Sequence, residues 1–190
     1  MGKLYEEIDE RLTKWIAEQH LFFTSTAPLS GDGLINCSPK GMDSFRIPGP
    51  TTVAYLDLTG SGAETIAHLK ENGRILIMFC AFTGSPFILR LHGTGQAFEV
   101  GSPGFEELIP HFDHLAGTRS IIRIEVQRIS DSCGYGESCG YGVPKHHYEN
   151  DRDTLIRWAE KKGEDGVRAY QQQNNRSSVD GLPGVEANAD

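Results

Sequence analysis

The feature that most restricts the fold of this chain is a series of short strand-like runs joined by turns. Residues with aromatic and β-branched side chains mark these runs as strands, at 20–27, 34–38, 51–58, 74–82, 87–100 and 120–130. Only isolated helical segments interrupt them, so the βαβ alternation of a parallel sheet is missing. The sequence therefore predicts a mainly β fold with flanking helices (α+β), built as a six-stranded antiparallel β-barrel.

Three helical patterns flank or interrupt the strands, at 3–19, 62–72 and 103–114. The first carries one apolar stripe at helical spacing, formed by Leu4, Ile8, Leu12 and Trp15. The second is expected to begin at Ser61 or Gly62 and to end just before Gly73. The third opens with Pro103 in its first turn.

The last forty or so residues differ in kind from the strand-rich part. Two helical patterns follow each other, DRDTLIRWAEKKG and EDGVRAYQQQNN, and the chain then turns repeatedly in SSVDGLPG. We expect a barrel domain with its N-terminal helix at 1–145 and a helical C-terminal extension, packed on the barrel, at 146–190.

Composition narrows the class of protein. The formal net charge of −8 argues against nucleic acid as a partner, because phosphate contacts need clustered Lys and Arg. No apolar run approaches the length of a membrane span, so no membrane is expected as a partner. The first residues are acidic and amphipathic rather than typical of a signal peptide, and the four cysteines then favour reduced thiols in the cytoplasm.

The segment 34–73 contains the most informative motif. A strand ending in Ser38-Pro39-Lys40-Gly41 precedes a second strand, and the turn Thr59-Gly60-Ser61-Gly62 then leads into a helix. A glycine-rich turn at a helix start presents free N–H groups and favours a phosphate. Lys40 would add a positive charge, and Ser61 and Thr65 would add hydroxyl groups. The alternative is a helix capped by Ser61 with nothing bound.

The order of these elements resembles the pyridoxamine 5′-phosphate oxidase-like family of FMN-binding split β-barrels. The matching segments are Ile35 to Gly41, Val53 to Asp57, the helix start at Ser61–Thr65, Asn72-Gly73-Arg74, and Leu89 to Gly93. The resemblance implies FMN as cofactor and a homodimer with the flavin in the groove between two barrels. It also implies cofactor-binding roles for Asn36, Ser38, Lys40, Tyr55, Asp57, Ser61, Gly62, Thr65 and Arg90.

The C-terminal extension resembles one branch of that family, which carries CGYGVP and a final DGLPG, here Cys139–Pro144 and Asp180–Gly184. The chain departs from the oxidase itself. Ser61, Gly62, Ala63 and Glu64 occupy the turn where the oxidase has a basic run, and the extension replaces the oxidase's substrate-binding C-terminus. These departures argue against pyridoxamine-phosphate oxidation as the activity.

Other chemistry-bearing side chains have simpler interpretations. Cys133 and Cys139 lie near His146 and His147, but their spacing is not that of a zinc site, and no metal is expected. His68, His92 and Trp158 are interpreted as packing or surface groups, and Cys37 and Cys80 as small side chains within strands.

The leading functional hypothesis is an FMN-dependent oxidoreductase acting on an unknown small molecule, since no side-chain catalytic set is visible and the flavin would carry the chemistry. The sequence names no catalytic residue. Two alternatives remain: a flavin-binding or storage protein without turnover, and the same fold with a deazaflavin or haem in place of FMN.

Overall fold

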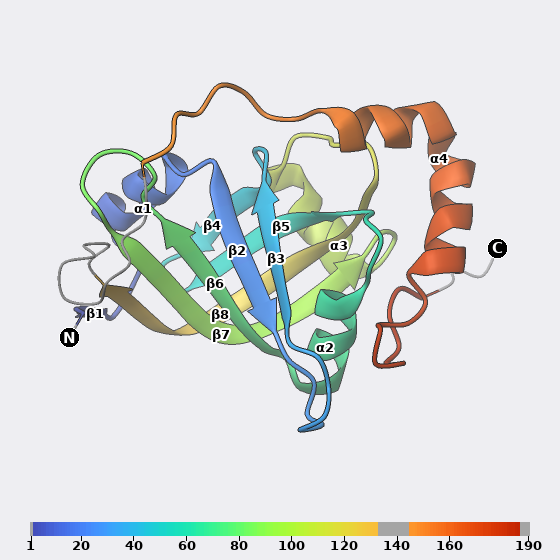
Figure 1. The fold of residues 1–190 in the computed structure, drawn as a ribbon, viewed down its shortest axis with the longest axis horizontal. Coiled ribbons are helices and arrows are strands. Elements are labelled where there is room, and N and C mark those ends of the chain that lie inside the picture. Colours follow the sequence, from blue (N-terminus) through green and yellow to red (C-terminus); the bar gives the residue numbers. More distant parts are fainter. Residues whose placement is uncertain (1, 133–144, 187–190) are drawn as a thin grey trace.

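The computed structural model describes residues 2–132 and 145–186, and its β-sheet is curled into an incomplete barrel (Figure 1). The strands are β1 (Leu4–Tyr5), β2 (Leu21–Thr26), β3 (Asn36–Gly41), β4 (Phe45–Gly49), β5 (Thr52–Leu58), β6 (Arg74–Cys80), β7 (Ile88–Glu99) and β8 (Thr118–Ser132). The helices are α1 (Glu10–Ala17), α2 (Glu64–Asn72), α3 (Pro103–Leu108) with a 3₁₀ turn at Ile109–His111, and α4 (Thr154–Asn174). Within the described residues no helix is long and apolar enough to cross a lipid bilayer.

The strands form one sheet in the order β3-β2-β6-β7-β8-β5-β4, with β1 added at β8. Every strand pair is antiparallel. The mainly β class with flanking helices is confirmed, but the described part of the chain forms a sheet of eight strands where the sequence predicts six. The additional strands are β1, which has only two residues, and β4, whose short FRIPG run contains a proline and lacks a clear alternating pattern.

The N-terminal segment is where the helix prediction extends too far. Helix α1 begins only at Glu10, because the Asp9 side chain accepts a hydrogen bond from the Leu12 N–H and caps it. Leu4 precedes it in β1, pairs with Ser130 and is 56% exposed. The inner part of the expected stripe is buried: Leu12 is fully enclosed and closes one end of the barrel core.

The other two helices are shorter than expected. Helix α2 starts at Glu64, with Ala63 rather than Ser61 or Gly62 as its N-cap residue, and it ends where Gly73 adopts a left-handed conformation. Helix α3 ends at Leu108 because Pro110 cannot continue an α-helix, and the chain passes into a 3₁₀ turn.

Two apolar clusters hold these elements. The larger fills the barrel and includes Phe22, Tyr55 and Phe79, whose rings meet at centroid distances of 5.4 and 5.6 Å from Phe22. The smaller lies between the outer side of the sheet and α3. It joins Leu56 and Ile121 to Phe105 and Leu108, so α3 covers β5 and β8 near the end where the candidate site lies.

The C-terminal extension crosses one end of the barrel and then turns down beside α2 (Figure 1). Its helix α4 is broken at Gly163, whose φ of 68° and ψ of 170° are not helical, so the two helical patterns of the sequence appear as two segments. Trp158 in the first segment packs edge-on against Tyr170 in the second, at a centroid distance of 4.9 Å. The interpretation of Trp158 as a packing residue agrees with this contact.

Candidate functional site

The most concentrated charge inside the described structure surrounds Asp57, near the end of β5. One carboxylate oxygen accepts a hydrogen bond from Lys40 Nζ at 2.9 Å, and the other accepts from Arg119 Nε at 2.7 Å. Ser120 Oγ adds a longer hydrogen bond of 3.3 Å to the second oxygen. Asp57 itself is fully buried, so this cluster is part of the interior of the barrel.

The two cations determine the charge state of Asp57. Burial alone would raise the pKa of its carboxyl group, but Lys40 and Arg119 hold this pKa well below its usual range. The carboxylate is therefore charged, and two positive groups surround one negative group. The Lys40 side chain remains 21% exposed. Its ammonium group has three N–H donors, and the hydrogen bond to Asp57 uses one of them. The cluster can thus offer a positive charge and hydrogen-bond donors to an anion.

Polar side chains next to Lys40 form a connected network on β3 and α2. Asn36 donates from its amide to Thr65 Oγ1 at 3.0 Å and to Thr26 Oγ1 at 3.2 Å, and its carbonyl oxygen accepts from Ser38 Oγ at 2.9 Å. Asn36, Ser38 and Lys40 alternate along β3 and share one face. Asn36 therefore fixes the positions of Ser38 and Thr65 beside Lys40.

The turn from β5 into α2 completes this region. Ala63, the N-cap residue of α2, has no side-chain acceptor, so the first N–H groups of the helix are left for another acceptor. Ser61 is exposed and Gly62 is half-buried. The Gly62 carbonyl accepts a hydrogen bond from Arg119 Nη1 at 2.8 Å, which ties the turn to the charged cluster.

One acidic side chain opposes an anion at this turn. Glu64 is the first residue of α2, and its carboxylate folds back against Gly62, where a side-chain carbon would lie 2.1 Å from Oε2. A carboxylate at a helix N-terminus is favourable for the helix dipole. Glu64 therefore occupies part of the space and of the positive potential that a phosphate would use.

Two residues expected at the site lie away from its open side. Tyr55 is completely enclosed in the barrel core, and its hydroxyl group is 3.5 Å from Thr24 Oγ1. Burial raises the pKa of Tyr55, so it stays neutral. Arg90 lies on β7 and donates from Nη1 to Ser132 Oγ on β8 at 2.8 Å, and it shares no hydrogen bond or ion pair with the Lys40 cluster among the described residues. The structure brings together Asn36, Ser38, Lys40, Asp57, Ser61, Gly62 and Thr65.

The C-terminal extension packs on the same turn. Gln171 donates to Thr59 Oγ1 at 2.7 Å, and the buried Asn175 donates to the Gly60 carbonyl at 3.0 Å. Gly184 lies so close to Ala63 that a side-chain carbon there would be 2.9 Å from the Ala63 methyl group. The extension thus supports the backbone that leads into α2.

Sequence reasoning missed Arg119 and Ser120 as members of the site. Both stand at the start of β8, next to Asp57 across the sheet, where Ser120 pairs directly with Asp57. The prediction placed 120–130 in a strand but gave no sign of which strand would neighbour β5. Because β8 also carries Arg123, Glu125 and Arg128, the charge of Arg119 alone does not mark it as a member of the site.

The zinc-type residues do not assemble in the part of the chain that can be described. Cys133 and Cys139 lie outside the described residues, and His146 and His147 are exposed. Among residues 2–132 and 145–186, no three His, Cys, Asp or Glu side chains group in a way that could hold a metal ion. His68 is fully buried and shares a hydrogen bond of 2.9 Å with Thr26 Oγ1.

Comparison with known proteins gives one close curated relative. The pyridoxamine 5′-phosphate oxidase family protein ustO of Aspergillus flavus is 39% identical over 201 residues, covering 98% of this chain and 79% of that protein. This match includes the C-terminal extension. No family model matches the chain.

Two solved structures share the fold at low sequence identity. HupZ of Group A Streptococcus is 22% identical with a TM-score of 0.51, and it covers 66% of this chain and 99% of its own. A protein of Lactobacillus delbrueckii described as a putative pyridoxamine 5′-phosphate oxidase is 14% identical with a TM-score of 0.50, covering 67% and 98%. About a third of this chain therefore has no counterpart in either structure.

Proposed function

The chain belongs to the pyridoxamine 5′-phosphate oxidase family, and on this premise we propose that it binds FMN and acts as a flavin-dependent oxidoreductase on a small molecule. The relationship at 39% identity supports a flavin-type cofactor. The choice of FMN rests on a feature of this chain, the positively charged cluster beside the uncapped start of α2. FMN has a phosphate group that such a place can bind.

Lys40 is the central residue of this proposal. Asp57, which is itself held by Arg119, keeps Lys40 in place. The partly exposed ammonium group of Lys40 lies on the same face of β3 as Ser38. The donors of Asn36 and Ser38 are already used inside the protein, so we assign these residues to positioning rather than to direct phosphate contact. Ser61 and the first N–H groups of α2 are the remaining donors.

The division of chemical work follows from this arrangement. When bound, the flavin supplies the electron-transfer chemistry. The protein binds the phosphate through Lys40 and the turn at Ser61 and Gly62, and the rigid barrel fixes this anchor in position. The small-molecule substrate would react at the flavin rather than at a set of catalytic side chains.

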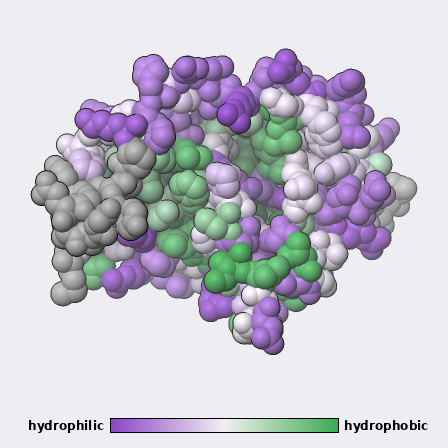
Figure 2. Space-filling model, viewed as in Figure 1, coloured by the Kyte–Doolittle hydropathy of each residue, from purple (hydrophilic) through white to green (hydrophobic). Residues whose placement is uncertain are grey.

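We also propose a homodimer. Four of the exposed apolar residues, Leu29, Leu34, Ile35 and Val179, are 60–78% exposed. They come from the β2–β3 hairpin and from the C-terminal segment, which meet where the Leu34 N–H donates to Asp180 Oδ2 at 3.0 Å. Figure 2 shows an apolar band low on this face of the molecule. An exposed patch of this kind is typical of a protein contact surface.

The dimer is tested by measuring molar mass with light scattering during size-exclusion chromatography. The wild-type protein should elute at twice the 20.9 kDa chain mass, and Ile35→Ser with Leu34→Ser should shift it toward the monomer. A wild-type monomer that still binds FMN tightly would contradict the dimer. Leu4→Ser, an equally exposed apolar position away from the hairpin, is the control.

The cofactor is tested by the absorbance spectrum of the purified protein and by titration with FMN and riboflavin. Lys40→Ala should weaken FMN by about 1.5–3 kcal/mol, as expected for a charge-assisted hydrogen bond, and leave riboflavin almost unchanged because riboflavin has no phosphate. Arg119 still balances Asp57 in this variant, so the fold should persist. Lys14→Ala, a change of equal charge on α1, is the control.

The outcomes separate the hypotheses. Equal losses for FMN and riboflavin would disprove the phosphate assignment. A single blue-shifted flavin-like band would indicate a deazaflavin, and a sharp Soret band would indicate haem. Rapid bleaching of the flavin by NADH or NADPH would favour an enzyme over a storage protein. We propose a cytoplasmic location, on the basis of the acidic, amphipathic first residues of the sequence.

A further inference from the structure

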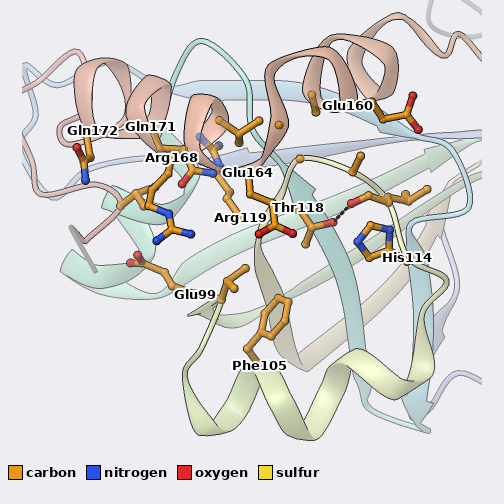
Figure 3. Close-up of a pocket in the computed structure, with 18 of the residues that line it drawn as sticks. Glu99, Phe105, His114, Thr118, Arg119, Glu160, Glu164, Arg168, Gln171 and Gln172 are labelled. Atoms are coloured by element: carbon orange, nitrogen blue, oxygen red, sulfur yellow. Dashed lines mark hydrogen bonds between the residues drawn. The ribbon is translucent and has the colours of Figure 1, made fainter. Parts of the chain in front are cut away.

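A pocket of about 540 Å³ lies under the C-terminal helix, apart from the open side of the Lys40 cluster. Its walls come from α4, from the loop before β8, from the end of β7 and from α3 (Figure 3). This volume lies in the range of small-molecule pockets, about 300–1,000 Å³. Arg119 and Gln171 line the pocket and also support the Asp57 cluster and the β5–α2 turn, but none of the residues assigned to the flavin phosphate lines it.

The break in α4 shapes the pocket. Gly163 has a positive φ with an extended ψ, a conformation that residues with a side chain avoid. The chain changes direction there, so the two segments of α4 run at an angle to each other (Figure 1). Ala159 in the first segment lies close to Gly117 in the loop before β8. Glu164 and Arg168 follow the break by one and five residues, and Figure 3 shows both side chains pointing from α4 toward α3 and β7.

Two of the other charged groups at the pocket are already engaged. Glu99 accepts from Lys70 Nζ at 2.8 Å through one oxygen and from the Glu186 N–H at 2.7 Å through the other. Arg119 donates to Asp57 and to the Gly62 carbonyl. These groups therefore serve the fold.

Glu164 and Arg168 are in a different state. They stand four residues apart, a spacing at which a Glu and a following Arg usually pair on a helix. Here neither forms an ion pair with the other or with any further residue in 2–132 and 145–186. Glu160 and Arg176 also line the pocket without an ion pair among the described residues. Glu164 and Arg168 differ from them in lying one helical turn apart, so that one negative and one positive group face the cavity together.

The remaining surface of the pocket is largely apolar. Phe105, Ile109, Leu115, Ala159 and Val167 contribute to its lining. Phe105, Ala159 and Val167 are buried, and they form a fixed surface rather than mobile side chains. A ligand that fits this pocket needs an apolar part and, at one end, both charges.

We propose that this pocket binds a zwitterionic amino compound with an apolar side chain, of the size of an amino acid or a short peptide. Its ammonium group contacts Glu164, its carboxylate contacts Arg168, and its side chain packs toward Phe105. The site is independent of the flavin. The pocket and the Asp57 cluster are neighbours, because Arg119 lines the pocket and also donates a hydrogen bond to Asp57.

The test uses the full chain and isothermal titration calorimetry with four related probes. L-Phenylalanine has both charges, 2-phenylethylamine lacks the carboxylate, 3-phenylpropanoate lacks the ammonium group, and N-acetyl-phenylalaninamide lacks both. L-Phenylalanine should bind at least tenfold more tightly than each of the others, since one charge-assisted hydrogen bond contributes about 1.5–3 kcal/mol.

Three variants assign the two charges. Glu164→Gln should weaken L-phenylalanine and 2-phenylethylamine but not 3-phenylpropanoate, and Arg168→Gln should weaken L-phenylalanine and 3-phenylpropanoate but not 2-phenylethylamine. Asp165→Asn removes an adjacent exposed charge that does not line the pocket and should change nothing. The proposal is overturned by undetectable binding of L-phenylalanine at millimolar concentration, by equal binding of 2-phenylethylamine, or by Glu164→Gln behaving like Asp165→Asn.

Discussion

Arginine and carboxylate side chains occur together in two neighbouring places of this molecule, but they form an ion pair in only one of the two. Around Asp57 they are buried and their hydrogen bonds are formed within the protein, whereas under α4 the side chains of Glu164 and Arg168 are exposed and have no ion-pair partner among the described residues. In the first place the charges join β3, β5 and β8. Under α4 the two charged side chains belong to one helix and link it to no other element by an ion pair among the described residues.

The difference shows how location decides the role of a charged group. A buried carboxylate must be compensated by the fold itself, because an unpaired buried charge is very costly. An exposed charge on a pocket wall has water as its default partner, so a ligand can replace that water. Arg119 stands at the boundary: its guanidinium is used by Asp57 and Gly62, while its side chain forms part of the pocket wall.

The largest effect is expected for Asp57→Asn. This change leaves Lys40 and the buried Arg119 facing each other without a negative charge between them. Removing one partner from a buried ion pair costs about 3–5 kcal/mol. We expect the free energy of unfolding, measured by urea denaturation, to fall by an amount in this range. Asp43→Asn, at an exposed pair with Arg46, is the control and should cost less than about 1 kcal/mol.

The pH dependence of stability checks the same point. The pKa of Asp57 is lowered in the folded state, so its contribution is complete above the unfolded pKa of about 3.9 and is lost as pH falls toward the folded value. The wild-type protein should therefore lose stability below about pH 4 more steeply than Asp57→Asn. Parallel curves for the two proteins would show that the Asp57 cluster is not the cause.

The contrast between the two places also explains what the sequence could predict. Alternating apolar residues in β2 and β8 and the Gly73 helix end depend on local rules, and the structure agrees with them. Lys40, Ser61 and Thr65 could be grouped because the chain brings them together within 26 residues. Arg119 and Glu164 could not, since their neighbours are set by strand order and by the packing of the extension.

The position of Arg90 illustrates the same limit. The sequence shows that it belongs to a strand, but which of two alternating faces carries it depends on register with β6 and β8. The late start of α1 has a comparable cause. Leu4 fits the helical pattern of the sequence. In the structure it lies outside α1, because β1 pairs with β8 and Asp9 caps the helix.

A second prediction addresses the geometry of the exposed pair. Gly163→Ala places a side chain where φ is 68°. This change should destabilise the observed conformation of α4 by about 1–3 kcal/mol, and the helix either keeps the strained backbone or straightens. Because straightening moves Glu164 and Arg168, L-phenylalanine should bind more weakly while the unfolding of the barrel changes little. The control is Gly166→Ala, three residues further along, where φ is not positive and the added carbon would make only a tight contact of 3.2 Å with Lys162 Cβ. Equal probe affinities in the two variants would show that the break does not shape the pocket.

A third prediction concerns the contact between the extension and the β5–α2 turn. Asn175→Ala removes the 3.0 Å hydrogen bond to the Gly60 carbonyl, which should cost about 1–2 kcal/mol of unfolding free energy. FMN affinity should fall as well, because Gly60 belongs to the turn assigned to the phosphate. Asn174→Ala is a close control, since within residues 2–132 and 145–186 the exposed Asn174 side chain bonds only to the Tyr170 carbonyl of its own helix. Lower stability with unchanged FMN affinity would make the extension a purely structural support.

The smallest effect, and the one that bears most directly on the phosphate assignment, is expected for Glu64→Gln. The Glu64 carboxylate lies against Gly62, where it competes with a phosphate for the positive end of α2. Interactions of this kind amount to about 0.3–1 kcal/mol near a surface. We expect Glu64→Gln to bind FMN about two- to fivefold more tightly while losing a similar amount of folding stability, because the helix loses its favourable charge.

This gain should depend on the phosphate and on salt. Riboflavin affinity should not change in Glu64→Gln, and the FMN gain should shrink at high ionic strength because the turn is partly exposed. Glu71→Gln, which removes the same charge near the other end of α2, should leave FMN affinity unchanged. If Glu64→Gln instead weakens FMN, the carboxylate helps to hold the turn in its binding conformation. The phosphate would then have to bind at Lys40 without the N–H groups of α2.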